Sequence, residues 1–201
     1  MHISEGVLSG PVLVSGFALA AAGTAIGLKK LDYENIAEIG ILSASFFVAS
    51  LVHVPIGPSN AHLVLNGILG LLLGWGAFPA ILTALTLQAV LFQFGGITSL
   101  GVNTLIMAIP AVICFYLFGA IIRKKPRWLS IAGFCCGFTA VFLSAVLAGA
   151  ALIFTEENFF KVAVLIVAGY SPVMVIEGIL TVFCVKFLNK VKPEIFSTFN
   201  F

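Results

Sequence analysis

Long apolar stretches run through this chain and alternate with short connections that hold most of the polar residues. Each stretch is close to the roughly 20 residues that a helix needs to cross a hydrocarbon core about 30 Å thick. A backbone in lipid must satisfy its own hydrogen bonds, which a helix does. The pattern therefore predicts an all-α polytopic membrane protein. Seven spans are expected, at residues 7–28, 36–54, 60–75, 77–94, 99–122, 128–154 and 159–188.

Three of these segments have features beyond a simple crossing. The last is longer than a bilayer requires, so we expect it to tilt, to protrude or to kink near Pro172. The third and fourth are joined by the uncharged residues 74–79, a tight connection that fits a hairpin at membrane depth. The chain contains no evident soluble domain or long linker, so residues 1–201 are interpreted as a single integral membrane domain.

Composition supports a membrane protein and excludes a soluble protein and a nucleic-acid-binding protein. Hydrophobic residues make up 61% of the chain and charged residues 9%, whereas a soluble surface needs roughly a quarter to a third charged residues. The mean hydropathy is +1.18. A net charge of +2 is too small for a phosphate-binding face, so nucleic acid is not an expected partner. The four cysteines lie within apolar stretches and are expected to be buried small side chains rather than disulfides or metal ligands.

The basic residues predict the orientation, because cytoplasmic loops collect Lys and Arg. With seven spans and an external N-terminus, nine of the ten basic residues fall on the inner side, and Lys161 falls on the outer side. We therefore expect Met1 outside and Phe201 in the cytoplasm, in a multi-pass protein of the cytoplasmic (inner) membrane. The chain begins without a basic leading region, so no removable signal peptide is expected.

Ionisable side chains are expensive in lipid, so those near the spans are candidate functional residues. The predicted topology brings His2 and the connection that contains His62 to the outer face. Prolines and a glycine in residues 55–58 indicate a fixed loop, after which Ser59 or Asn60 is expected to cap the third helix. His62 would then lie in the first turn, where the helix dipole keeps the imidazole neutral and able to bind a metal.

A histidine at position 2 has a specific metal chemistry. The amine of Met1, the deprotonated amide nitrogen of His2 and Nδ1 of its ring can hold one cation in a five-membered and a six-membered chelate ring. These three nitrogens are nearly coplanar, and His62 is the obvious source of a fourth. A plane of nitrogen ligands favours Ni(II) or Cu(II) over Zn(II) or Mg(II). The sequence thus predicts a metal site at the outer face.

Other polar residues are candidates to support such a site through hydrogen bonds. His53 is interpreted as a polar group at a helix end or as a partner of a ligand, and Glu5 as such a partner or as a solvated carboxylate. The amides of Gln88, Gln93 and Asn103 are expected to bridge helices or brace loops near the site. Of these, Gln93 and Asn103 are expected closest to the outer face.

Glu177 and two alanines are candidates for a different role. Glu177 is expected in the inner half of the seventh span, either hydrogen-bonded inside the bundle or acting in coupling to a partner or as a proton site. Ala18 and Ala22 form a small-xxx-small pattern, which permits close approach to a helix of the bundle or of a partner protein. Packing within the bundle is the interpretation that we prefer.

Together these residues resemble the NikM/CbiM family, the substrate-capturing components (S components) of energy-coupling factor (ECF) transporters for nickel and cobalt. The resemblance runs through essentially the whole chain, and is carried by the opening MHISEG, the loop ending in Ala61 and His62, residues 91–104 and residues 172–178. It implies a seven-helix S component that holds its metal through the amine of Met1, the amide and ring of His2, and the ring of His62. This ligand set agrees with the chelate argument.

The resemblance also implies partners: a transmembrane coupling (T) protein, a pair of cytoplasmic ATPase (A) subunits and often a small auxiliary membrane protein, in addition to membrane lipid. The chain has no GxxxxGK[ST] nucleotide loop, so we expect a binding subunit rather than an enzyme, with no cofactor. Residues 63–65, LVL, stand where cobalamin-associated members usually have Pro-Thr-Gly. This departure favours nickel over cobalt as the substrate.

Two other classes are alternatives. An intramembrane metal-dependent enzyme would use His2, His62 and Glu177, but the expected topology separates Glu177 from both histidines. An S component for a vitamin would require a larger polar pocket than this sequence offers. The leading hypothesis is high-affinity binding of nickel at the outer face followed by ATP-driven transport, with cobalt transport for cobalamin biosynthesis as its alternative.

Overall fold

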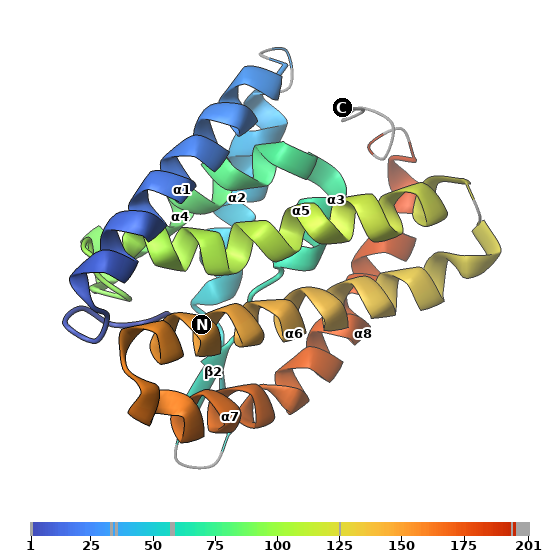
Figure 1. Ribbon diagram of the computed structural model, residues 1–201. Helices are drawn as coiled ribbons and strands as arrows, with labels where there is room; N and C mark the ends of the chain where they lie inside the picture. The colour runs from blue at the N-terminus through green and yellow to red at the C-terminus, as the bar shows by residue number, and fades with distance from the viewer. Residues whose placement is uncertain are drawn as a thin grey trace.

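The structure is a computed structural model that describes residues 2–32, 34, 36–56, 59–124, 126–193 and 195. In this part of the chain, α-helices form a bundle and a short antiparallel strand pair lies at one end of it (Figure 1). The α-helices are α1 (Gly10–Lys30), α2 (Ile36–Ser50), α3 (Asn66–Leu73), α4 (Ala77–Phe92), α5 (Leu100–Lys124), α6 (Leu129–Thr155), α7 (Phe160–Gly169) and α8 (Ser171–Val191). The strands are β1 (His53–Ile56) and β2 (Ser59–His62), and the short 3-10 helices are η2 (Gly74–Gly76), η3 (Pro126–Trp128) and η4 (Glu157–Phe159).

The apolar helices agree with a multi-pass membrane protein, but the predicted count of seven spans is not confirmed. Five segments within the described ranges are long and apolar enough to cross a bilayer: Gly10–Lys30, Asn66–Phe92, Leu100–Arg123, Leu129–Thr155 and Glu157–Val191. Helix α2 is apolar but has only 15 residues. Helices α3 and α4 follow each other directly through η2, so they fall within a single apolar segment.

The last apolar segment is broken where the sequence predicts a kink. Helix α7 ends at Gly169, and α8 begins at Ser171, directly before Pro172. Proline has no N–H to donate to the carbonyl of Ala168, four residues earlier. The hydroxyl of Ser171 donates to that carbonyl instead, at 2.7 Å. The kink near Pro172 is therefore confirmed, and a side chain satisfies the backbone group that the proline leaves.

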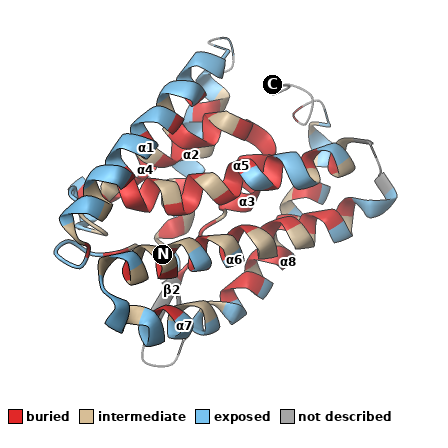
Figure 2. Cartoon of the chain, viewed as in Figure 1, coloured by how far each residue is buried: buried red, intermediate tan, exposed pale blue. Residues whose placement is uncertain are grey.

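Helix α1 packs on the bundle through a face of small residues. Its buried positions are Gly16, Ala20, Gly23 and Gly27. A Cβ at Gly16 would lie 2.3 Å from Cγ2 of Val102, so α1 and α5 approach closely at this point. Ala18 and Ala22 are exposed, on the outward side of α1 that Figure 2 shows in pale blue. The prediction that Ala18 and Ala22 pack within the bundle is therefore wrong, because the buried face runs through the glycines and Ala20.

Helix α3 is enclosed by the bundle. All eight of its residues are buried. At Gly70 an added Cβ would lie 2.0 Å from the carbonyl oxygen of Ala111 in α5, which only a glycine permits. The chain therefore passes from the β1–β2 hairpin into the middle of the protein before α3 begins. Residues 63–65, which make this passage, lie directly after His62.

Candidate metal site

Two of the predicted ligands, His2 and His62, lie side by side although 59 residues separate them in sequence. Their ring centroids are 4.7 Å apart and the ring planes are inclined by 38°. His2 belongs to the N-terminal segment, and His62 is the last residue of β2 and is buried. Met1, which would supply the terminal amine, lies outside the described residues. The fold thus brings two of the predicted ligand side chains next to each other.

His62 reaches this position from a strand, which corrects the prediction that it lies in the first turn of a helix. Helix α3 begins at Asn66, and its N-cap is Leu65 rather than Ser59 or Asn60. Burial, not the helix dipole, therefore lowers the pKa of the His62 imidazole below its ordinary value. Burial has the same effect as the one expected from the helix dipole, because it also keeps the His62 ring neutral near pH 7.

The hairpin also pairs the two internal histidines. In the antiparallel register of β1 and β2, His53 stands opposite His62. The side chain of His53 lies outside the description, so its predicted support of a ligand stays a prediction. His62 Nδ1 lies 3.0 Å from the carbonyl oxygen of Leu63. Because a carbonyl only accepts, the proton of the neutral ring is on Nδ1 and the lone pair is on Nε2.

His2 is held by an amide from α4. Its Nε2 lies 2.7 Å from Oε1 of Gln88, a fully buried residue. Gln88, Gln93 and Asn103 were all expected near the site, with Gln93 and Asn103 closest to the outer face, but Gln93 is exposed at the C-cap of α4, with φ +58°. The buried face of α4 includes Ala84, Leu85 and Gln88, whereas the helix has already ended at Gln93. An amide within an otherwise apolar helix made Gln88 a candidate, but the sequence did not show which amide of α4 would meet His2.

Asn103, at the start of α5, binds the peptide that follows His2. The N–H of Ile3 donates to Asn103 Oδ1 at 2.9 Å, and Asn103 Nδ2 donates to the carbonyl of Ile3 at 3.1 Å. Asn103 Nδ2 also donates to the hydroxyl of Ser99 at 3.1 Å. Asn103 is almost completely buried. This amide pair fixes the main chain directly beside the predicted ligand, as expected for a residue that braces the site.

Glu5 joins the N-terminal segment to the loop between α4 and α5. Its Oε1 accepts from the N–H of Thr98 at 3.1 Å, and its side chain is exposed. A Cβ at Gly96, where φ is +112°, would lie 1.9 Å from Cγ of Glu5. At Gly95, with φ +78°, an added Cβ would lie 2.8 Å from Nδ2 of Asn103. The two glycines therefore let this loop close tightly over the N-terminal segment.

Glu177 lies much closer to His62 than the sequence predicts. Oε1 of its carboxylate accepts from the N–H of Val64. The N–H of Leu65 donates to both carboxylate oxygens, at 3.0 Å to Oε1 and 3.1 Å to Oε2. The predicted separation of Glu177 from His62 is wrong, because residues 63–65 enter the bundle and meet Glu177 before α3 begins. The expected hydrogen bonding inside the bundle is confirmed. With 1% of its surface exposed, Glu177 is not available for direct contact with a partner.

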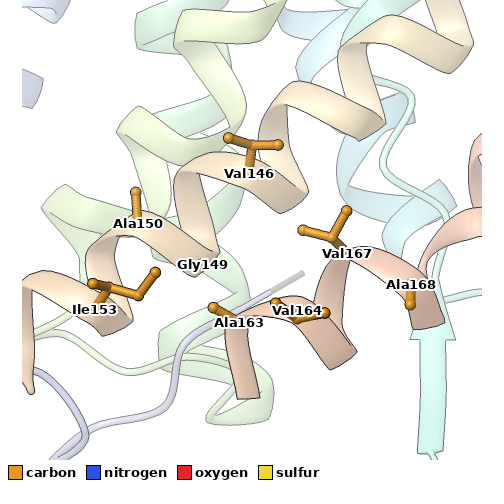
Figure 3. A pocket seen from close by; sticks show the side chains of 8 residues that line it. All are labelled: Val146, Gly149, Ala150, Ile153, Ala163, Val164, Val167 and Ala168. Carbon is orange, nitrogen blue, oxygen red and sulfur yellow. The ribbon is translucent and has the colours of Figure 1, made fainter. Parts of the chain in front are cut away.

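The cavities do not resemble a site for a polar organic molecule. One, of about 470 Å³, lies between α6 and α7 and is lined by Val146, Gly149, Ala150, Ile153, Ala163, Val164, Val167 and Ala168 (Figure 3). Its lining has no polar side chain. A second, of about 220 Å³, lies among α1, α5 and α6 and has Ser15 as its polar side chain. Neither offers the several polar groups that would fix the orientation of a vitamin.

A sequence model described as "CbiM: Cobalt uptake substrate-specific transmembrane region" matches residues 2–195. This chain belongs to the CbiM family. The match includes His2, His62, Gln88, Asn103 and Glu177, so all the described residues of the candidate site lie within the CbiM region.

Curated relatives extend along most of this CbiM chain. A Haemophilus influenzae protein named "Putative metal transport protein" is 41% identical over 207 residues, covering 100% of both chains. A Rhodobacter capsulatus "Fused nickel transport protein NikMN" is 33% identical over 78% of this chain and 49% of its own length. A Geobacter sulfurreducens "Cobalt transport protein CbiM" is 26% identical over 97% of this chain and 61% of its own length.

Solved structures have the same fold as this CbiM chain. One described as a transition metal transporter has a TM-score of 0.71 and 27% identity, covering 96% of this chain and 95% of that chain. A truncated transition metal transporter has a TM-score of 0.70 and 26% identity, covering 94% of this chain and 99% of that chain. These relatives are named as metal transporters rather than enzymes, and the CbiM region is a transmembrane one. The chain is accordingly a multi-pass membrane protein of a metal-transporter family.

Proposed function

We propose that this protein captures a divalent nickel or cobalt ion at the extracytoplasmic face and presents it for uptake as the substrate-binding component of an ECF transporter. The observation that carries the proposal is the pairing of His2 and His62, with ring centroids 4.7 Å apart. The membership in the CbiM family and the names of its nickel and cobalt transport relatives support the same substrate class.

The proposed ligands are the amine of Met1, the amide nitrogen and Nδ1 of His2, and Nε2 of His62. Both rings present a lone pair, because the other nitrogen of each ring faces an oxygen acceptor. Four nitrogens in a plane suit Ni(II) better than Zn(II). Nickel is the proposed substrate for this reason and because of the LVL sequence after His62. Cobalt is the alternative, favoured by the description of the family.

We place the site outside the cell and the other end of the bundle in the cytoplasm. At that other end Lys30 lies 5.7 Å from the ring centroid of Trp75 in η2, and Lys192 forms an ion pair with Glu38 of α2. The loop between α5 and α6 adds Arg127. Basic residues collect on the cytoplasmic side of membrane proteins. We therefore propose that the protein lies in the cytoplasmic membrane with its basic end inside the cell.

Transport would require partners, because in this proposal the chain only captures the ion and the energy for transport comes from other subunits. The partners are an ECF coupling (T) protein, cytoplasmic ATPase (A) subunits and a small auxiliary membrane protein. Ala18 and Ala22 lie on the exposed side of α1, where small side chains permit close approach of another helix. We propose this side as the contact with the coupling protein.

The direct test is metal analysis of protein purified with its natural first residue and without an N-terminal tag. One equivalent of nickel, with the visible absorption of a square-planar nitrogen field, is the expected result. A spectrum of six oxygen ligands would contradict the proposal. Stabilisation by a vitamin but not by nickel would favour the vitamin alternative.

Replacing His62 with Ala should remove the fourth nitrogen. Loss of an outer hydrogen-bond partner typically lowers metal affinity about 10- to 100-fold, and loss of a ligand should lower it by roughly 100-fold or more. Calorimetric titration with nickel measures the change. Ser45→Ala, which alters an exposed hydroxyl on α2, is the control and should leave affinity unchanged. Equal affinity of His62→Ala and the parent protein would remove His62 from the ligand set.

Nickel affinity should fall as pH falls. The Met1 amine, with an ordinary pKa of about 7.7 to 8.0, must lose a proton to bind, and the His2 amide must lose one at every pH. Burial lowers the pKa of His62, so protons compete for that ring only below its ordinary value of about 6.5. Two protons are then released per ion between about pH 6.5 and 7.5, and affinity should drop roughly 100-fold per pH unit. Titrations in buffers of different ionisation enthalpy count these protons; a count of zero would contradict an amide ligand.

A further inference from the structure

A directional chain of hydrogen bonds leads from α2 through α4 to His2. Its first step is the hydroxyl of Ser50, which donates to the carbonyl of Phe47 at 2.6 Å. A hydroxyl has one proton, so Ser50 Oγ can only accept from its other neighbour. That neighbour is Nε2 of Gln88, which donates to Ser50 Oγ. The amide of Gln88 is thereby oriented with its NH₂ group toward Ser50 and its carbonyl toward His2.

The orientation of Gln88 determines which nitrogen of His2 carries the proton. Gln88 Oε1 lies 2.7 Å from His2 Nε2, and a carbonyl oxygen only accepts. His2 Nε2 therefore donates, and the lone pair of the neutral ring is on Nδ1. A six-membered chelate ring through the His2 amide closes only on Nδ1, because Nε2 lies on the far side of the imidazole. The protein thus presents the one tautomer that can chelate.

Burial makes this series of hydrogen bonds rigid, as a positioning role requires. Gln88 is 0% exposed and Ser50 2% exposed, so water does not compete for either side chain. On the other side of His2, the amide of Asn103 holds the main chain of Ile3 in both directions. The ring of His2 is therefore held at Nε2, and the backbone is held one residue later.

We propose that Gln88, oriented by Ser50, is a positioning residue that fixes the tautomer and ring orientation of His2 for chelation of the substrate ion. The inference rests on the proposed function for its purpose, but the tautomer itself is a property of the metal-free protein. Metal-binding histidines generally donate their other nitrogen to an oxygen acceptor, and loss of that acceptor weakens binding. Here the acceptor is a neutral amide whose direction is set by a second side chain.

The first measurement is ¹⁵N NMR of the metal-free protein labelled at histidine. The chain has three histidines, so the ring signals are assigned by replacing each in turn. In the parent protein His2 should be protonated at Nε2. Gln88→Leu should give a mixture of tautomers, and Gln88→Glu, which retains an acceptor, should restore the Nε2–H form. Protonation of His2 at Nδ1 in the parent protein would overturn the proposal.

A second variant changes the direction of the amide without touching His2. Ser50→Ala removes the acceptor that fixes Gln88, so the amide can rotate and offer its NH₂ group to His2. The fraction of His2 protonated at Nε2 should then decrease, although Gln88 is still present. Thr86→Ala, which alters an exposed hydroxyl on α4, is the control and should leave the tautomer unchanged. A tautomer that is unaffected by both Ser50→Ala and Gln88→Leu would overturn the proposal.

Nickel titration of the same variants separates this inference from the proposed function. Affinity should fall about 10- to 100-fold in Gln88→Leu and recover in Gln88→Glu to within a few-fold of the parent value. A parent protein that shows the Nε2–H tautomer but binds no nickel would refute the proposed function and leave the control of the tautomer standing. A parent protein that binds nickel in a planar field, with Gln88→Leu binding equally well, would refute the role of Gln88 alone.

Discussion

An extension of several residues before Met1 is expected to abolish planar nickel binding while the protein remains folded. The extension converts the amine of Met1 into an internal amide and carries the new terminal amine away from the chelate, so the proposed plane loses its amine nitrogen. The expected loss of affinity exceeds the roughly 100-fold upper range for an outer partner. Calorimetry and visible absorption on purified protein provide the measurement.

The control for this experiment is the same extension added after Phe201. It should leave both the affinity and the spectrum unchanged. Thermal unfolding in detergent should be the same for both extended proteins without metal, because the bonds of Ile3 to Asn103 do not involve the amine. Unchanged nickel affinity in the N-terminally extended protein would refute the ligand set.

Replacing Glu177 with Ala is expected to destabilise the protein strongly. The carboxylate accepts from the buried N–H groups of Val64 and Leu65. A buried donor without a partner costs about 1–3 kcal/mol, so two such donors lower the free energy of unfolding by about 2–6 kcal/mol. Nickel affinity should also fall, because His62 lies two residues before Val64. Thermal unfolding and nickel titration measure the two effects.

Two further variants separate the hydrogen bonds of Glu177 from its charge. Glu177→Gln retains one acceptor oxygen and should recover part of the lost stability. Glu157→Ala removes an exposed carboxylate at the start of η4 and should change the unfolding temperature little. If Glu177→Ala unfolds at the same temperature as Glu157→Ala, the carboxylate does not secure the passage of the chain after His62.

The sequence was most informative where one residue decides the local structure. Pro172 cannot donate to Ala168, so a break in the last segment follows from covalent chemistry. The chelating potential of His2 likewise depends on its position in the chain rather than on the fold. The apolar runs likewise predicted a multi-pass helical protein, since a helix that crosses the hydrocarbon must be long and apolar, but they did not predict the number of spans.

The sequence was less informative where long-range contacts override local preference. Ser59 and Asn60 are good N-caps, yet the helix begins at Asn66, because Glu177 of α8 supplies the acceptor from elsewhere in the chain. Which amide of α4 meets His2 depends on the rotation of that helix in the bundle, and a uniformly apolar helix gives little indication of its buried face. The exposed position of Ala18 is another consequence of this uniformity.

The two imidazoles of the candidate site are anchored to different parts of the bundle, and in the proposed function this would divide control of the ion between them. His2 is tied to α4 through Gln88, whereas the chain just after His62 is tied to α8 through Glu177. In a well-formed site, metal–ligand distances lie within about 0.2 Å of their usual values. A slight sliding of α8 relative to α4 would therefore separate the two rings and release the ion without unfolding any helix. The metal affinity would then depend on how these two helices are aligned.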